Sequence, residues 1–396
     1  MAIFTWVNCL IIPAFLFGIL LPFPLSAFTE QPPDQILIPR NKPVLIGLAA
    51  PLSGENARLG IDMEQGMRMA MRQRPFLFDH KIDLLHLDDQ CDPGKILSLA
   101  AKFTKNPHMA GVIGYMCTTE TLNALKAHEK AALPLISATS SSFSLTAKAS
   151  PILFRINVNE LVQAKGMALY ARKKKWRRAM VIHGPSPHSL ALSEAFKEAF
   201  LKRKGNRLAI EPLPQEEGGS EELIKAMKKK RPQLIAVFAS PKEIDQVLRI
   251  RAIKASRRAA FFLDQRFYEE RGSLKLGQKK FDGLYMTSAS LLKGRHQEEW
   301  LQSYRRSYGE QGIYTFQAHD AVSILIKAIR SAASPLENGD IIIDKGKLLK
   351  AIQNTDFQGI SGSIRFDDKG DRTTGMVTIR RINKKTLKVV NEIAVK

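Results

Sequence analysis

Short, wholly apolar runs alternate with helical patterns along most of this chain of 396 residues. The run Val44–Ala50 contains no polar side chain, and a loop rich in Pro, Ser and Gly follows it at 51–54. An unbroken apolar run of this length is typical of a strand that is buried on both faces, as in a parallel sheet. The alternation with helices therefore predicts an α/β fold with doubly wound parallel sheets.

The alternation comes in two successive series, and the chain is too long for one ordinary core, so we expect two lobes. The predicted strands of the first series are 44–50, 82–87, 109–115, 133–137 and 152–156, and those of the second are 179–183, 208–211, 234–239, 259–263 and 283–287. Ligands of open α/β sheets bind beyond the carboxyl ends of the strands. The loops that follow these strands are therefore the first place to look for a site.

Residues 1–27 carry no charged side chain and are dominated by apolar residues and proline. The segment ends in Leu-Ser-Ala at 25–27 and resembles a secretory signal peptide with cleavage after Ala27. An uncleaved membrane anchor is the alternative, but the prolines argue against a regular spanning helix. We expect export to the periplasm, with 28–42 as an N-terminal extension of the mature chain.

Without that leader, two cysteines remain, Cys91 and Cys117. An even number of cysteines in an exported chain favours one disulfide bond, and two buried free thiols are the alternative.

The formal net charge is +22, and part of it is concentrated in four clusters, at 172–178, 202–204, 228–231 and 257–258. Each cluster follows a predicted helix and precedes a predicted strand, so all four should share the pole opposite the ligand loops. A solvated basic pole is one explanation, and weak attraction to an anionic membrane surface or an acidic partner is the other. Export and the lack of a recognised nucleic-acid module argue against nucleic acid.

Hydroxyl groups gather in the loops after two strands of the first series, at 117–119 and 137–142. Thr118 or Thr119 is a candidate N-cap of the next helix. A helix N-terminus offers free backbone N–H groups, and neighbouring hydroxyls add neutral donors, so the arrangement suits a carboxylate. The alternative is that these residues only cap helices and fill a loop.

Several segments taken together resemble one family. They are the cysteine-containing blocks 88–93 and 114–119, the opening segment 46–66, the loop 135–146, the helix start 319–322 and the C-terminal block 357–371. In these segments the chain resembles the periplasmic leucine/isoleucine/valine-binding proteins, over about residues 43–385. The resemblance implies the type I periplasmic-binding fold, in which a three-crossing hinge joins the lobes. Lobe one would be 43–156 plus 284–362, and lobe two 157–283 plus 363–396.

The resemblance also implies a ligand site between the lobes. Thr118, Thr139 and Ser141 would hold the ligand's carboxylate, and Asp264 would meet its ammonium group. The loop 184–188 reads Gly-Pro-Ser-Pro-His where the family usually has an aspartate followed by a Tyr-Gly pair, and His188 is a candidate ligand contact there. Leu59 takes the place of an aromatic residue that often covers the ligand in the family. The expected ligand is therefore an amino acid, an amide or a related carboxylate.

By the same resemblance, the protein would act as a monomer that delivers its ligand to an ABC transporter permease. A sensory or scaffold protein of the cell envelope with the same fold is the alternative. The sequence contains no phosphate-binding loop, no nucleophile elbow and no histidine spacing typical of a metal site. We therefore expect neither an enzyme nor a cofactor or metal.

Overall fold

The structure is a computed structural model that describes residues 34–395, with gaps at 55, 215–219, 257, 264–266, 268–277, 290–294, 313, 374 and 385. The predicted signal peptide, 1–27, lies outside the described residues, as does 28–33 of the predicted extension. Within the described part, the helices are all too short or too polar to cross a membrane.

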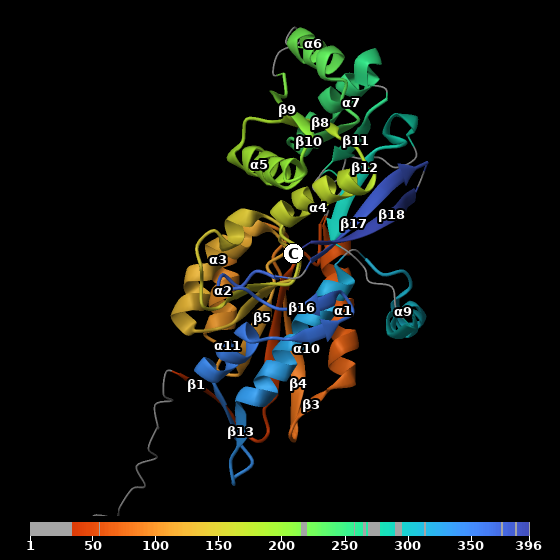
Figure 1. Ribbon diagram of the computed structural model, residues 1–396. Coiled ribbons are helices and arrows are strands. Elements are labelled where there is room, and N and C mark those ends of the chain that lie inside the picture. Colours follow the sequence, from red (N-terminus) through yellow and green to blue (C-terminus); the bar gives the residue numbers. More distant parts are fainter. Residues whose placement is uncertain are drawn as a thin grey trace, which may run out of the picture. The chain divides into compact units, whose positions relative to one another are not determined.

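The first half of the chain forms a six-stranded sheet in the order β3-β4-β2-β5-β6-β7 (Figure 1). Its strands are β2 (Val44–Ala50), β3 (Phe76–Leu77), β4 (His80–Asp88), β5 (Met109–Ile113), β6 (Leu135–Ser137) and β7 (Leu153–Arg155). All neighbours are parallel except β3 and β4, which form a hairpin. The carboxyl ends of β2, β5, β6 and β7 consequently lie along one edge.

Alternate residues of β2 enter two different cores, as expected of a strand buried on both faces. Ile46 and Leu48 pack with helices α1 and α10 in one core, whereas Ala49 packs with α2 and α3 in the other. The helices around this sheet are α1 (Ala57–Gln73), α2 (Ile96–Thr104), α3 (Thr118–Ala131), α10 (Thr315–Ala332) and α11 (Lys345–Gln353). The first sheet is thus covered by helices on both sides.

A second, seven-stranded sheet has the order β18-β17-β12-β11-β10-β8-β9. Its strands are β8 (Arg178–His183), β9 (Arg207–Pro212), β10 (Leu234–Phe238), β11 (Ala260–Leu263), β12 (Tyr285–Ala289), β17 (Gly375–Asn383) and β18 (Thr386–Val395). The first five are parallel, and β17 and β18 add an antiparallel edge. The helices that accompany it are α4 (Glu160–Lys173), α5 (Pro187–Leu201), α6 (Ser220–Lys230) and α7 (Ile244–Ala252).

One predicted boundary differs from the structure. The expected division at 283/284 placed residues 285–289 in lobe one, but β12 pairs with β11 and β17 and so belongs to the second sheet. The alternation of strands and helices places the strand 283–287 in the second series, and the pairing with β11 agrees with that prediction and not with the boundary implied by the family resemblance.

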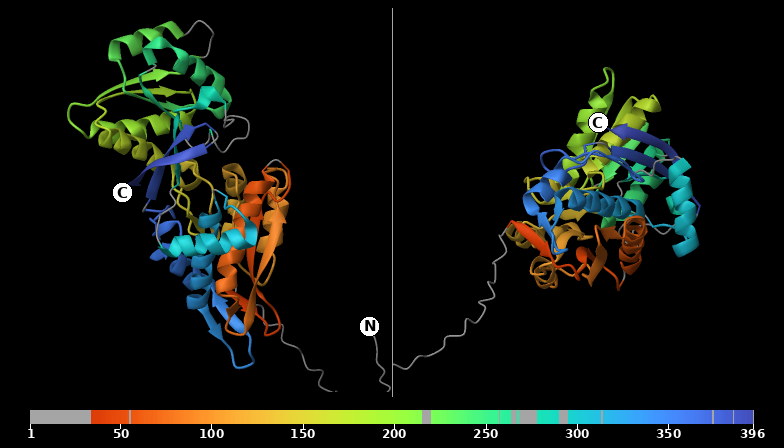
Figure 2. Two further views of the ribbon diagram at one scale, coloured as in Figure 1. Left: turned by 90° about the vertical axis from the view of Figure 1, so that its right-hand side faces the viewer. Right: turned by 90° about the horizontal axis from the view of Figure 1, so that it is seen from below.

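The chain passes between the two sheets three times, after β7, after β12 and before β17. The first and third of these segments are joined by a buried ion pair, in which Arg155 Nε donates to Asp371 Oδ1 over 2.7 Å. Asn159 and Thr146 bind the other oxygen of Asp371. Figure 2 shows the chain from two further sides.

Small elements complete the chain. They are the three-stranded sheet of β1 (Gln35–Ile38), β14 (Ile341–Asp344) and β13 (Ala333–Pro335), the hairpin of β15 (Phe357–Gly359) and β16 (Gly362–Ile364), and helix α9 (Arg295–Tyr308).

Candidate functional site

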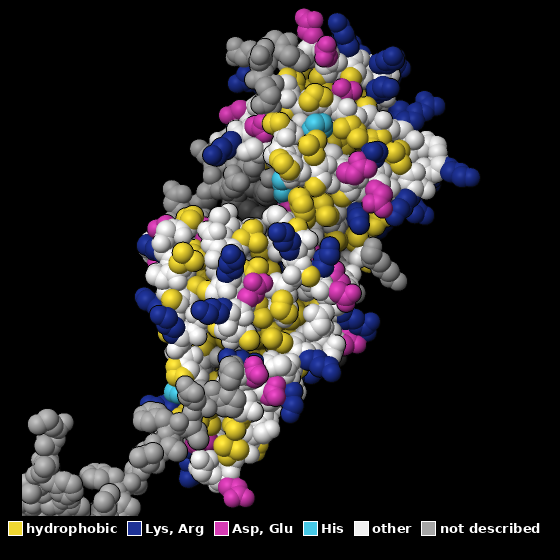
Figure 3. All heavy atoms as spheres, turned by 90° about the vertical axis from the view of Figure 1, so that its left-hand side faces the viewer, with side chains coloured by type: hydrophobic (Ala, Val, Ile, Leu, Met, Phe, Trp, Pro, Cys, Tyr) yellow, Lys and Arg dark blue, Asp and Glu magenta, His cyan; other side chains and the backbone are white. Residues whose placement is uncertain are grey.

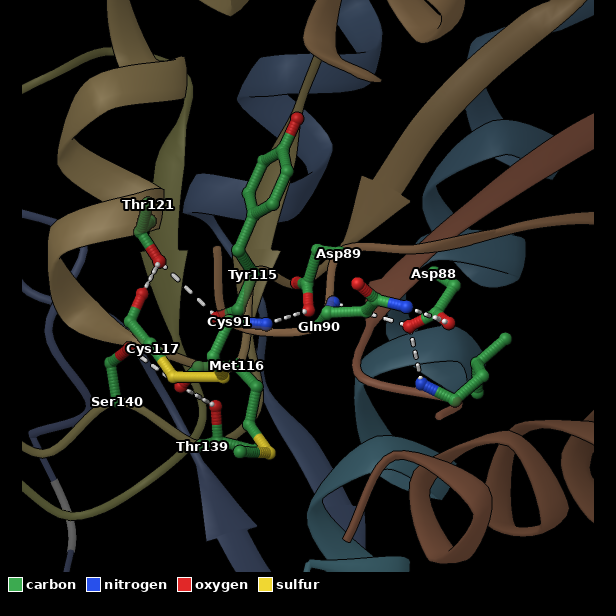
Figure 4. The surroundings of a disulfide bond; sticks show 11 residues. Asp88, Asp89, Gln90, Cys91, Tyr115, Met116, Cys117, Thr121, Thr139 and Ser140 are labelled. Carbon is green, nitrogen blue, oxygen red and sulfur yellow. Dashed lines mark hydrogen bonds between the residues drawn. A yellow bond between two sulfur atoms is a disulfide. The ribbon is translucent and has the colours of Figure 1, made fainter. Parts of the chain in front are cut away.

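Two loops at the carboxyl edge of the first sheet are bonded to each other. They follow β5 and β6, which are parallel neighbours. The hydroxyl of Thr139 donates to the carbonyl oxygen of Met116 over 2.8 Å, and Ser140 donates to the same oxygen over 3.4 Å (Figure 4). The polar residues that the sequence places after these two strands are therefore brought together at one position.

Helix α3 begins at this position, with Thr118 as its first residue. The N-cap is Cys117, whose backbone is extended and whose side chain does not cap the helix. The prediction that Thr118 or Thr119 is the N-cap was therefore wrong, because the chain turns into the helix one residue earlier. Thr118 is half-buried and Thr119 is exposed. The first turn of α3, whose backbone N–H groups have no partner within the helix, thus lies beside the loop that contains Thr139.

The same turn is held by a disulfide bond between Cys91 and Cys117, whose Cα atoms are 6.1 Å apart (Figure 4). The bond ties the loop after β4 to the start of α3. The backbone N–H of Cys91 also donates to Asp89 Oδ1 over 3.0 Å. Two loops of the candidate site are thus fixed by a covalent bond and by a buried carboxylate.

Two buried carboxylates, Asp89 and Glu120, lie next to the disulfide. Oδ2 of Asp89 and Oε2 of Glu120 have no hydrogen-bond partner among the described residues. Burial raises the pKa of Asp89 to about 6, and the negative charge of Glu120 acts in the same direction. Burial also raises the pKa of Glu120. No local sequence pattern marks these two residues as special, because only their burial in the fold makes them unusual.

Ser141 joins the first sheet's loop to the second half of the chain. Its carbonyl oxygen accepts the N–H of Glu160, the first residue of α4, over 2.9 Å. Ser141 itself is buried. The residue predicted to hold the ligand's carboxylate is therefore in direct contact with the first crossing segment.

His188 lies in the first turn of α5 and is bound to the same glutamate. Its Nδ1 is 2.9 Å from Glu160 Oε1, which also accepts the backbone N–H of Phe143 over 3.0 Å. The ring of His188 stacks on that of Phe143, with centroids 6.1 Å apart. Glu160 thus connects His188 to the residues that surround Ser141.

Asp264 lies outside the described residues, and β11 ends at Leu263, directly before it. Leu59 packs, partly buried, against the core between α1 and α10.

Sequence reasoning missed Glu160 as a residue of the site. The Asn159 side chain accepts the N–H of Leu161 and so marks the start of α4. That signal reveals a helix start but not the contact with His188.

Comparison with known proteins gives a consistent result. The family model described as periplasmic binding protein matches residues 43–386. The leucine-, isoleucine-, valine-, threonine- and alanine-binding protein of Pseudomonas aeruginosa is 23% identical, and the match covers 83% of this chain and 87% of that protein. The Leu/Ile/Val-binding protein of Escherichia coli is 21% identical, with 83% of this chain and 88% of that protein covered.

Solved structures agree with this fold. An ABC transporter substrate-binding protein of Desulfitobacterium hafniense matches with a TM-score of 0.75 at 17% identity, over 88% of this chain and 100% of that one. A solute-binding protein of R. palustris in complex with benzoate matches with a TM-score of 0.63 at 16% identity, over 89% of this chain and 97% of that one. The predicted α/β class and the resemblance to leucine/isoleucine/valine-binding proteins are confirmed. The chain belongs to the periplasmic binding protein family, in its leucine-binding-like branch, whose members bind solutes and are not enzymes.

Proposed function

We propose that this protein captures a small organic ligand in the periplasm and delivers it to an ABC transporter permease. The ligand would be an amino acid, an amide or a related carboxylate. The observation that supports this most directly is the junction of the two loops at the carboxyl edge of the first sheet. There, an uncapped helix start lies beside a cluster of hydroxyl groups that are held in place by hydrogen bonds to Met116.

Thr118 and Ser141 would supply the contacts to a ligand carboxylate or amide oxygen. Both lie at this junction, and a helix N-terminus favours a negative group. Thr139 already donates its hydroxyl hydrogen to Met116, so its oxygen would serve only as an acceptor or as a fixed part of the wall.

The second half of the chain would contribute His188 and Asp264. Glu160 fixes Nδ1 of His188, which leaves Nε2, an atom that is buried and has no partner among the described residues. A histidine at this position admits ligands other than aliphatic amino acids. The same fold accommodates leucine in the Desulfitobacterium hafniense complex and benzoate in the R. palustris complex.

In this proposal the chain is a monomer that is exported by its first 27 residues, and the two lobes close on the ligand by hinge motion. Lobe one would be built on the first sheet and lobe two on the second, with the boundary moved so that β12 belongs to lobe two.

Mass spectrometry of small molecules released from the purified, unfolded protein tests the proposal, followed by titration calorimetry with each candidate. We expect a carboxylate or amide that binds with one-to-one stoichiometry. A panel of amino acids, amides and aromatic acids of which none binds would contradict the ligand class. Uptake of the labelled ligand by cells that lack the protein then tests delivery, because unchanged uptake would favour sensing over transport.

A further inference from the structure

The turns that precede β8, β9 and β10 form a surface that we call the basic face, made up of 172–178, 202–207 and 228–231. Together these turns contain 14 Lys and Arg residues and no Asp or Glu. The three strands are parallel neighbours in the order β10-β8-β9, so their amino ends lie side by side. The charges are thus gathered in space as well as in sequence.

Arginine side chains join these turns to one another. Arg177 Nη1 donates to the carbonyl oxygen of Lys204 over 3.4 Å, and Arg178 Nε donates to that of Arg231 over 2.8 Å. Arg203 Nη1 likewise donates to the carbonyl oxygen of Arg172 over 3.4 Å. Several guanidinium groups are therefore used within the protein, and the charges offered to a partner are mainly lysine ammonium groups.

Lysines of all three turns are exposed, among them Lys175, Lys204 and Lys229. Leu201, at the end of α5 and next to one of the turns, is also exposed, with 43% of its surface accessible. Lys and Arg side chains stand at the outer margin of the upper part of the molecule in Figure 3.

This chemistry fits a smooth anionic surface better than a nucleic acid. Lysine ammonium groups act as point charges on flexible stems, whereas bidentate recognition of phosphates and bases uses free guanidinium forks. The ring of Trp176, the aromatic residue of these turns, packs against Tyr170 and Tyr285, at centroid distances of 5.9 and 6.5 Å. It is therefore occupied within the fold and is not offered for stacking on a base.

We propose that the basic face binds the surface of a bilayer that contains anionic phospholipids. The face lies at the amino ends of the strands, opposite the loops of the candidate ligand site. A typical strand separates these ends by about 17–20 Å, which exceeds the screening length of about 8 Å at physiological salt. The protein can therefore rest on the membrane through this face while the ligand loops stay clear of it. The inference does not depend on the identity of the ligand.

Sedimentation with lipid vesicles tests this. The purified protein is mixed at low salt with vesicles of phosphatidylglycerol and phosphatidylcholine, or of phosphatidylcholine alone. One variant replaces Lys175, Lys204 and Lys229 by Glu. Its matched control replaces Lys102, Lys126 and Lys130 by Glu, which are exposed lysines on α2 and α3 and give the same change in net charge. Circular dichroism and thermal unfolding show that both variants remain folded.

We expect the protein to bind the vesicles that contain phosphatidylglycerol and not those of phosphatidylcholine alone, and we expect added salt to weaken this binding. Each surface lysine strengthens such binding about fivefold, so the basic-face variant should bind about a hundredfold more weakly, whereas the control should stay within about threefold. Equal losses in both variants would show that only net charge matters and would overturn the proposal. Binding to duplex DNA as tight as to the anionic vesicles would overturn it as well, because it would identify a general polyanion surface.

Discussion

Nδ1 of His188 lies 2.9 Å from Oε1 of Glu160, so a histidine predicted to contact the ligand is held by a carboxylate that the sequence did not reveal. The same oxygen accepts the backbone N–H of Phe143, and the backbone N–H of Glu160 donates to Ser141. One buried residue at the start of α4 therefore holds His188 through its side chain and the Ser141 loop through its backbone and side chain.

Replacing Glu160 by Ala should lower the free energy of unfolding by about 3 kcal/mol, because it removes two hydrogen bonds to a charged group and leaves the N–H of Phe143 without a partner. Glu194→Ala is the matched control, since Glu194 is exposed and pairs with Lys197 at the surface, so its loss should cost less than about 1 kcal/mol. Urea unfolding of both variants measures the difference. An equal loss of unfolding free energy in the two variants would mean that the carboxylate of Glu160 stabilises the protein no more than a surface charge does.

The buried Asp89 should make the protein less stable as the pH rises. Its pKa is raised to about 6 in the folded state, whereas the pKa of an aspartate in the unfolded chain is about 3.9. Between these values the folded state binds more protons, so stability falls with rising pH, and the full loss is present above pH 6. Asp89→Asn should therefore stabilise the protein at pH 7 by about 3 kcal/mol and have little effect at pH 4.

Urea unfolding at the two pH values checks this prediction. Asp245→Asn serves as the control, because Asp245 is largely exposed and its replacement should change the free energy of unfolding little at either pH. If parent and Asp89→Asn lose the same stability between pH 4 and pH 7, Asp89 is not the group responsible.

The disulfide should contribute about 3 kcal/mol to stability. Cys91 and Cys117 are separated by 26 positions, and cross-linking a loop of this length mainly reduces the entropy of the unfolded chain. Denatured, unreduced protein that lacks its leader should contain no free thiol, and reduction should lower the free energy of unfolding by that amount. Two titratable thiols in the unreduced protein would show that the bond does not form.

The sequence was most informative where a local pattern decides the structure. Val44–Ala50 reads as a buried strand, and it is one. It was less informative where partners far apart in the chain decide. The strand at 283–287 was predicted in the second series, which is where it lies, but the lobe boundary implied by the family resemblance placed it in lobe one. No local feature reveals its pairing with β17. The contact between Glu160 and His188 joins the starts of two helices, and only the packed fold brings them together.

Thr118 and Ser141 should each contribute to ligand affinity. Thr118 is the first residue of an uncapped helix, and Ser141 lies in the loop that is bonded to the same turn. Replacing either by Ala should weaken binding of a ligand identified by mass spectrometry by about 1–3 kcal/mol, because a hydrogen bond to a charged or polar oxygen is lost. Thr119→Ala is the matched control, since Thr119 is the exposed neighbour on the same helix turn and should change affinity less than about twofold. Titration calorimetry measures all three. Should Thr118→Ala and Ser141→Ala bind as tightly as Thr119→Ala, the hydroxyl groups at this junction only shape the loops, and the contacts to the ligand must come from backbone N–H groups or from the second half of the chain.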